Sequence, residues 1–211
     1  MKKIVFQINI PNINDKQSLT AYTYMEEMYK ISERNAKKYA KKCNADYYVV
    51  RTRDDFLPAA RKHIDFQKLK MYDFLDYDSV LYMDSDYIIK DNAPDIFEIC
   101  KNNFSAVRDY GKSVPDLAKG ISIPEDRYFN AGFMHIPTKV LQETKNVLLS
   151  NYIHHEYKFD GQGCLNKMFY EQGIVFYPLK SEEWNPVKKT FGLYGDHYAG
   201  TKKRRWGQVQ Y

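Results

Sequence analysis

Ser79–Asp86 (SVLYMDSD) is the stretch of sequence that decides the fold. Its apolar run up to Met83 predicts a buried strand over Ser79–Met83. Burying that strand forces Asp84 and Asp86 to the edge of a sheet, where the two carboxylates would repel each other unless a cation compensates their charge. Oxygen ligands of this kind suit Mg²⁺ or Mn²⁺. The stretch therefore predicts a metal site at a strand end, although the tripeptide taken alone would favour an acidic turn that faces solvent.

The segments around this strand alternate between strand and helix patterns. Further strands are predicted at Lys3–Ile10, Tyr47–Thr52, Tyr87–Ile89, Phe104–Arg108, Gly132–Ile136 and Ile174–Tyr177. Helices are predicted at Ser18–Lys42, Phe66–Leu75, Thr138–Asn151 and Gln162–Glu171, with one more that Asn92 caps and that has Pro94 in its first turn. This alternation predicts an α/β fold, a mostly parallel central sheet with helices on both faces. Ligands of such sheets bind beyond the carboxyl ends of the strands, and that rule points at Asp84-Ser85-Asp86.

Length and composition restrict the class of protein. A chain of 211 residues with 44% hydrophobic content is expected to form one folded domain over residues 1–211, and the end at Lys202–Tyr211, which lacks a clear stop, fits a piece cut from a longer chain. No run is long enough to span a membrane and no apolar segment follows Met1-Lys2-Lys3, so we expect a soluble, cytoplasmic protein. The net charge of +5 suits an anionic small ligand and is too dispersed to require nucleic acid.

Several ordered blocks between Ile4 and Trp206 carry a family resemblance. They are Phe66-Gln67-Lys68-Leu69, Tyr77–Asp86, Phe104–Asp109 (FSAVRD), Tyr128–Phe133 (YFNAGF), Gly161–Asn166 (GQGCLN) and His197–Lys203 (HYAGTKK). Together they resemble the retaining glycosyltransferases of family 8, which include glycogenin and bacterial galactosyltransferases. They also resemble a glycosyltransferase domain of a large algal (chlorella) virus. The family resemblance implies the GT-A fold, a Rossmann-like fold of nucleotide-diphospho-sugar transferases.

The last block follows the family pattern His-x-x-Gly-x-x-Lys through His197, Gly200 and Lys203. The resemblance implies that His197 is a third metal ligand beside Asp84 and Asp86, and that Lys203 meets the diphosphate of the donor. Both roles suit the chemistry, because neutral imidazole is a good ligand and an ammonium pairs with phosphate. A lone histidine would usually be structural, but this spacing together with the acidic pair favours a ligand.

The resemblance implies further contacts with the donor. Lys68 would reach its phosphate or sugar, Asp109 a sugar hydroxyl, and the Asn130 amide would lie beside the sugar, where small neighbouring residues let the backbone approach the ligand. Each has an ordinary alternative: a solvated helix lysine, a loop aspartate and a plain strand start. The family binds the nucleotide base at the carboxyl end of the first strand, and the sequence does not decide which residue there makes the contact: Gln7, Ile8 or Asn9.

The Gly161–Asn166 block departs from the family pattern Asp-Gln-x-x-Leu-Asn. Gly161 stands where the family has aspartate, and Asp160 precedes it, so either Asp160 reaches the sugar hydroxyls from a shifted backbone or that contact is absent. The resemblance places Gln162 nearest the anomeric carbon. Because an amide cannot act as a base at neutral pH, Gln162 favours retention of configuration, with its side chain or a backbone carbonyl giving electrostatic support.

These features together predict a metal-dependent transfer of a hexose-type sugar from a UDP-sugar to an acceptor hydroxyl of a glycan, with Mn²⁺ or Mg²⁺ as cofactor. The partners expected are the nucleotide-sugar donor and the carbohydrate acceptor. An inverting glycosyltransferase of the same fold is one alternative. A second is an Asp-x-Asp phosphotransferase or phosphatase, which normally carries its acidic pair on the first strand, and a third is a non-catalytic module that binds through the basic segment Lys202–Arg205.

Overall fold

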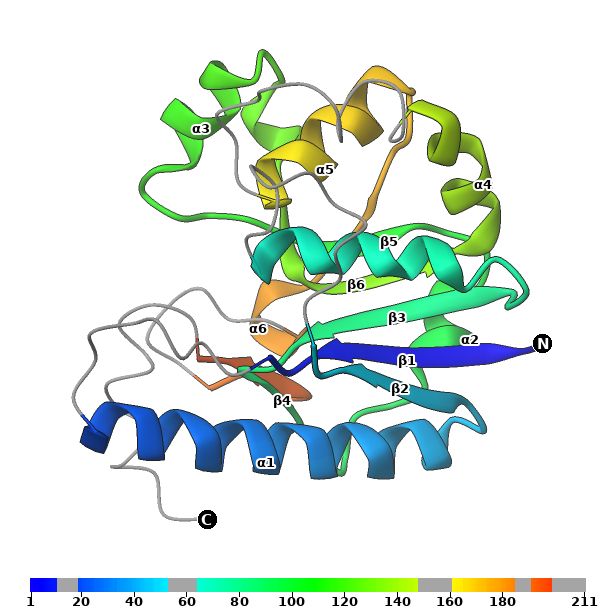
Figure 1. Cartoon of the computed structure of the whole chain (residues 1–211). Coiled ribbons are helices and arrows are strands. Elements are labelled where there is room, and N and C mark those ends of the chain that lie inside the picture. The colour runs from blue at the N-terminus through cyan, green and yellow to red at the C-terminus, as the bar shows by residue number, and fades with distance from the viewer. Residues whose placement is uncertain (11–18, 53–63, 148–160, 185–190, 199–211) are drawn as a thin grey trace.

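Six strands form the central sheet of the computed structural model. The structure describes residues 1–10, 19–52, 64–147, 161–184 and 191–198 (Figure 1). The order of the strands across the sheet is β2 (Asp46–Val50), β1 (Lys3–Ile8), β3 (Ser79–Asp84), β6 (Phe129–Pro137), β5 (Ser105–Arg108) and β7 (Tyr177–Leu179). Only β6 runs antiparallel to its neighbours β3 and β5, while the other pairings within this sheet are parallel. The predicted mostly parallel α/β sheet is therefore confirmed.

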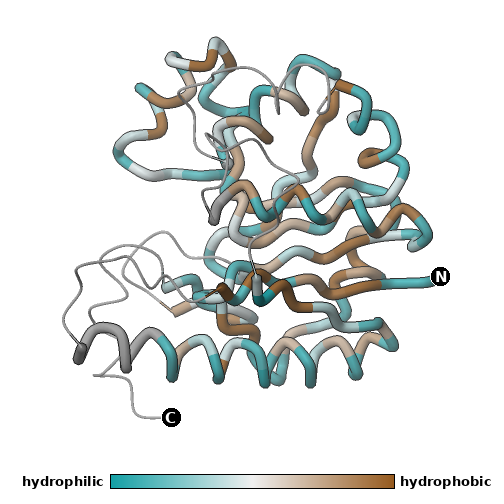
Figure 2. Tube along the Cα trace, viewed as in Figure 1, coloured by the Kyte–Doolittle hydropathy of each residue, from teal (hydrophilic) through white to brown (hydrophobic). Residues whose placement is uncertain are grey.

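Helices cover both faces of this sheet, as the sequence predicts. One face carries the 3₁₀ helix η2 (Ile64–Asp73), α4 (Thr138–Val147) and α5 (Gly161–Glu171), and the other carries α1 (Leu19–Lys42), α2 (Ile96–Cys100) and α6 (Ser181–Trp184). Successive residues of β3 point to opposite faces. Tyr82 packs in the core under η2 and α5, and Met83 packs in the core against α1 and α2. Burial on both faces explains why the strand is a continuous apolar run, and Figure 2 shows hydrophobic residues along the central strands and a largely hydrophilic α1.

A second, two-stranded sheet lies at the carboxyl end of β3. The chain turns at Ser85 into β4 (Tyr87–Ile89), which pairs antiparallel with β8 (Gly195–His197), so that Tyr87 lies opposite His197. The backbone amide of Tyr198 also donates to the carbonyl oxygen of Asp86 at 2.9 Å. The sequence does not predict β8, a strand of 3 residues. It brings the late part of the chain to the acidic turn.

Three further elements differ from the predicted ones. Asn92 does not cap α2: Asp95 does, and its carboxylate accepts the Phe97 amide at 2.9 Å and pairs with Lys3 at 3.1 Å. The last strand of the main sheet is not Ile174–Tyr177, because the amide of Ile174 still bonds back to the Phe169 carbonyl at the end of α5, and pairing begins only at Tyr177. The strand β6 begins at Phe129 instead of Gly132.

Three short helices lack a predicted counterpart: α3 (Val114–Gly120), η3 (Glu125–Arg127) and α6.

The described residues show two other features of the fold. Cys43, Cys100 and Cys164 are buried free thiols. Among the described residues, no helix combines the length and the apolar character that crossing a bilayer requires.

A buried histidine in β6 makes the fold sensitive to acid. Burial lowers the pKa of His135 to about 4, although its Nδ1 lies 3.1 Å from the Asn103 carbonyl oxygen, a hydrogen bond that partly opposes the shift. Between pH 6.5 and pH 4 the unfolded chain binds this proton while the folded chain does not, so the free energy of unfolding falls as the pH falls. We expect this loss to reach about 3 kcal/mol from this residue. The free energy of unfolding of His135→Gln should therefore fall less than that of the parent chain, by about 3 kcal/mol over the same pH range. Urea unfolding at pH 7, 5.5 and 4.5 measures both proteins. An equal fall in the two would contradict the prediction.

Candidate active site

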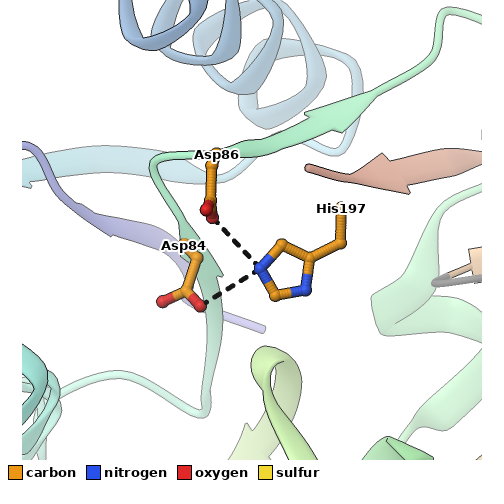
Figure 3. Close-up of side chains that lie close together, drawn as sticks. All are labelled: Asp84, Asp86 and His197. Carbon is orange, nitrogen blue, oxygen red and sulfur yellow. Dashed lines mark hydrogen bonds and ion pairs between the residues drawn. The ribbon is translucent and has the colours of Figure 1, made fainter. Parts of the chain in front are cut away.

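Asp84, Asp86 and His197 converge where β3, β4 and β8 meet (Figure 3). The Nε2 atom of His197 lies 3.0 Å from Oδ1 of Asp86 and 3.5 Å from Oδ2 of Asp84. One ligand atom from each of the three side chains lies within 4.8 Å of the others. The two aspartates flank the turn at Ser85, and the histidine arrives 111 positions after Asp86 along the chain. The three residues predicted as metal ligands thus lie together.

The electrostatics of this cluster favour a positive charge at its centre. Burial alone would lower the pKa of His197, but the carboxylates of Asp86 and Asp84 outweigh it and raise that pKa to about 9. Burial alone would raise the pKa of Asp84, but Lys68 and His197 lower it below its usual range. Asp84 is therefore held as a carboxylate. Two carboxylate oxygens and one imidazole nitrogen fit Mn²⁺ or Mg²⁺, with the imidazole favouring the softer Mn²⁺.

Gly132 lets β6 pass directly beside the cluster. A Cβ atom at this position would lie 2.9 Å from Oδ2 of Asp84 and 2.9 Å from Nδ1 of His197, and would overlap Cε1 of the histidine. These contacts are too short for any side chain larger than hydrogen. The sequence indicates close backbone approach in the block around Gly132, and the structure identifies the groups approached as the two candidate ligands.

Lys68 and Tyr82 hold the other oxygen of Asp84. The Tyr82 hydroxyl donates to Oδ1 of Asp84 at 2.5 Å, and the Lys68 ammonium lies 3.3 Å from the same oxygen. Lys68 is buried, with 6% of its surface exposed, so it is not the solvated helix lysine that the sequence also allowed. Tyr82 is not among the residues that sequence reasoning selected, although its position two residues before Asp84 puts both side chains on one face of β3.

Gln7 and Ser32 secure the backbone of the acidic turn. The Gln7 amide donates to Ser32 Oγ at 3.0 Å and to the Asp84 carbonyl oxygen at 3.4 Å, and it accepts the Tyr47 hydroxyl at 2.8 Å. The Ser32 hydroxyl donates to the Tyr87 carbonyl oxygen at 2.6 Å. These contacts hold the turn from both ends. Sequence reasoning missed Ser32, which lies within a polar-looking helix without a local signal.

The residues predicted to contact the nucleotide base lie in three different environments. Gln7 is 1% exposed and engaged with the turn, and Ile8 is buried in the core against η2. Asn9 is half-buried, and its amide donates to Glu33 at 3.2 Å. Of the three side chains, that of Asn9 alone is not fully buried in the described structure.

A hydrogen-bonded group joins α5 to the strands beside the cluster. Gln162 donates to Oδ2 of Asp109 at 3.0 Å and accepts the Ala131 amide at 2.9 Å. Asn130 accepts the Gly132 amide at 2.9 Å. Asn166 binds both backbone groups of Phe129, at 2.8 and 2.9 Å, which fixes the first turns of α5 against β6. The structure thus joins Gln162 to Asp109 and to Ala131, the neighbour of Asn130 in β6, while Asp160, Gly200 and Lys203 lie outside the described residues.

Comparisons with known proteins agree with this architecture. The family model described as Glycosyl transferase family 8 matches residues 2–210. A glycosyltransferase involved in the glycosylation of the major capsid of PBCV-1 is 14% identical with a TM-score of 0.62, and the alignment covers 99% of this chain and 100% of that one. The galactosyltransferase LgtC, solved with donor and acceptor sugar analogues, is 17% identical with a TM-score of 0.53, covering 98% of this chain and 94% of that one. The apo form of GlyE from Streptococcus pneumoniae TIGR4 is 16% identical with a TM-score of 0.54, covering 99% and 60%.

At these identities the structural likeness supports the fold, and it confirms the predicted GT-A architecture. No curated protein matches the sequence significantly.

Proposed function

The chain belongs to glycosyl transferase family 8 and is a glycosyltransferase, and from this premise we propose that it moves a hexose-type sugar from a UDP-sugar to a hydroxyl of a glycan acceptor, with a divalent metal and with retention of the anomeric configuration. Membership over residues 2–210 removes the support for a phosphatase or a non-catalytic basic module.

The convergence of Asp84, Asp86 and His197 is the observation that carries the metal part of the proposal. These side chains would hold Mn²⁺, or Mg²⁺, at the carboxyl end of β3, where ligands of such sheets bind. When bound, the cation would supply positive charge against the charge that develops on the leaving diphosphate. Because Gly132 has no side chain, β6 does not crowd the cluster, and the hydrogen bonds of Gln7 and Ser32 hold the acidic turn in place. The three side chains would therefore need little rearrangement to bind the ion.

The remaining residues supply binding and orientation. The donor phosphates would contact Lys203, Gly200 and Lys68. The donor would also contact Ser85 in the acidic turn and Asn9, which follows β1. Asp109, Asn130 and Asp160 would contact sugar hydroxyls. Lys68 is already paired with Asp84, so its positive charge lies at the cluster whether or not it also reaches the donor.

Gln162 supports retention. Its side-chain amide is oriented by hydrogen bonds to the Asp109 carboxylate and to the Ala131 backbone amide. An amide is no general base at neutral pH, and an inverting reaction needs a base at the acceptor. Gln162 would instead stabilise positive charge on the sugar, together with backbone carbonyls.

Two measurements on the same reaction test the proposal. A screen of nucleotide sugars with Mn²⁺ should find a UDP-sugar that is consumed by hydrolysis or transfer, and EDTA should abolish its consumption. NMR of the product should show the anomeric configuration of the donor. An inverted product would refute retention while leaving the metal site intact, and consumption that survives EDTA would refute the metal.

A further inference from the structure

Oδ1 of Asp84 is occupied from within the protein. Within the described part of the chain, its two donors are the Tyr82 hydroxyl at 2.5 Å and the Lys68 ammonium at 3.3 Å. The second oxygen, Oδ2, faces the opposite way, toward His197 at 3.5 Å and toward the backbone of β6 at Gly132. The carboxylate therefore has one side that is satisfied by the fold and one side directed at the cluster.

Tyr82 is held too firmly to release this bond easily. Its side chain is 1% exposed, and its ring packs against Phe6 with centroids 5.4 Å apart. The Lys68 ammonium lies 5.4 Å from the centroid of the same ring. Turning Asp84 so that both of its oxygens faced the cluster would break the bond between Oδ1 and the buried Tyr82 hydroxyl, which costs free energy.

We propose that Tyr82 is a positioning residue for the metal site: its hydroxyl fixes the rotation of the Asp84 carboxylate, so that Asp84 offers Oδ2 alone to the cation. The inference rests on the proposed function, because it concerns the same site. Tyr82 is not itself a candidate ligand. It orients the ligand Asp84, as the hydrogen-bonded partners of metal ligands generally do.

Tyr82→Phe removes only the hydroxyl and keeps the ring in the core. We expect the affinity of the whole chain for Mn²⁺, without nucleotide, to fall by about tenfold or more, since loss of such partners typically weakens metal binding 10–100-fold. The melting temperature of the variant in EDTA, compared with that of the parent chain, shows whether the substitution alters the stability of the fold itself. The free Mn²⁺ signal in electron paramagnetic resonance reports binding directly and does not depend on sugar transfer.

Tyr72→Phe is the matched control. Tyr72 is also buried, and its hydroxyl bonds Thr144 Oγ1 at 2.7 Å, away from the acidic cluster. Its loss is expected to leave Mn²⁺ affinity unchanged. A Tyr82→Phe variant that binds Mn²⁺ within twofold of the parent chain would overturn the inference while leaving the proposed metal site intact.

A crystal of the unaltered chain with Mn²⁺ keeps the inference testable if Tyr82→Phe does not fold. One oxygen of Asp84 on the ion, with the other still bonded to the Tyr82 hydroxyl, is the expected arrangement, and both oxygens on the ion would overturn it. A parent chain that binds no Mn²⁺ at all would remove the proposed metal and this inference together.

Discussion

Asp86→Ala is expected to abolish sugar transfer, with kcat lower by about 10³-fold or more in saturating Mn²⁺. Asp86 contributes the oxygen nearest to the imidazole of His197, at 3.0 Å, so its loss removes one candidate ligand and leaves the histidine beside Asp84 alone, at 3.5 Å. Charge stabilisation by a bound metal is worth several kcal/mol at the transition state, and each 1.36 kcal/mol corresponds to a factor of ten in rate. Initial rates with the UDP-sugar found by the screen measure the effect.

Asp91→Ala provides the comparison for this substitution. Asp91 is also an aspartate paired with a cation, Lys38, at 2.6 Å, but both side chains are exposed. An exposed ion pair contributes little to stability, so activity and Mn²⁺ affinity should match the parent chain. Circular dichroism at the assay temperature checks that Asp86→Ala remains folded despite losing a buried pair. Activity within tenfold of the parent in a folded Asp86→Ala protein would contradict the assigned role of Asp86.

Gly132→Ala is expected to lower the affinity for Mn²⁺ by about 100-fold and to remove transfer with it. The added methyl group would lie 2.9 Å from Oδ2 of Asp84 and would overlap the imidazole of His197. The backbone cannot retreat freely, because Phe133 of β6 is in register with Met83 of β3. Asp84 is also fixed, through Tyr82. The candidate ligands must therefore separate, and the overpacking should cost about 1–3 kcal/mol of stability.

Gly120→Ala is the control for a methyl group added to a glycine. Gly120 ends α3, and a Cβ atom there would meet nothing within 4 Å. Titration calorimetry measures the Mn²⁺ affinity of the two variants, and thermal melting measures their stability. Gly120→Ala should match the parent chain in both quantities. Normal Mn²⁺ affinity in Gly132→Ala would show that the cluster can shift without losing its ion, and would contradict the close packing described above.

Local pattern was enough to predict much of this fold. The apolar run over Ser79–Met83, the helical spacing over Ser18–Lys42 and the alternation of strands with helices each reflect burial of a face, which a single segment displays in its own sequence. The errors lie at short elements and boundaries. Asn92 and Asp95 are both good caps by residue type, and in the structure it is Asp95 that caps α2 and also pairs with Lys3 on a distant strand.

The candidate site divides in the same way. The acidic pair could be read from the residues alone, whereas His197, Lys68, Asp109 and Gln162 were reached through the family resemblance. Tyr82 and Ser32 were missed, because a tyrosine in an apolar strand and a serine in a helix are ordinary in their local sequence. Their roles come from hydrogen bonds to Asp84 and to the Tyr87 backbone, which no local pattern encodes.

By itself, then, the sequence determined that a buried strand would deliver two carboxylates to a sheet edge, since hydrophobic periodicity and the adjacency of Asp84 and Asp86 are properties of one short segment. Only the tertiary structure decided what surrounds them. The imidazole arrives from 111 positions away through the pairing of β8 with β4, and the room for it depends on a glycine in β6. Contacts between segments so far apart depend on which strand edges and helix faces meet when the whole chain packs.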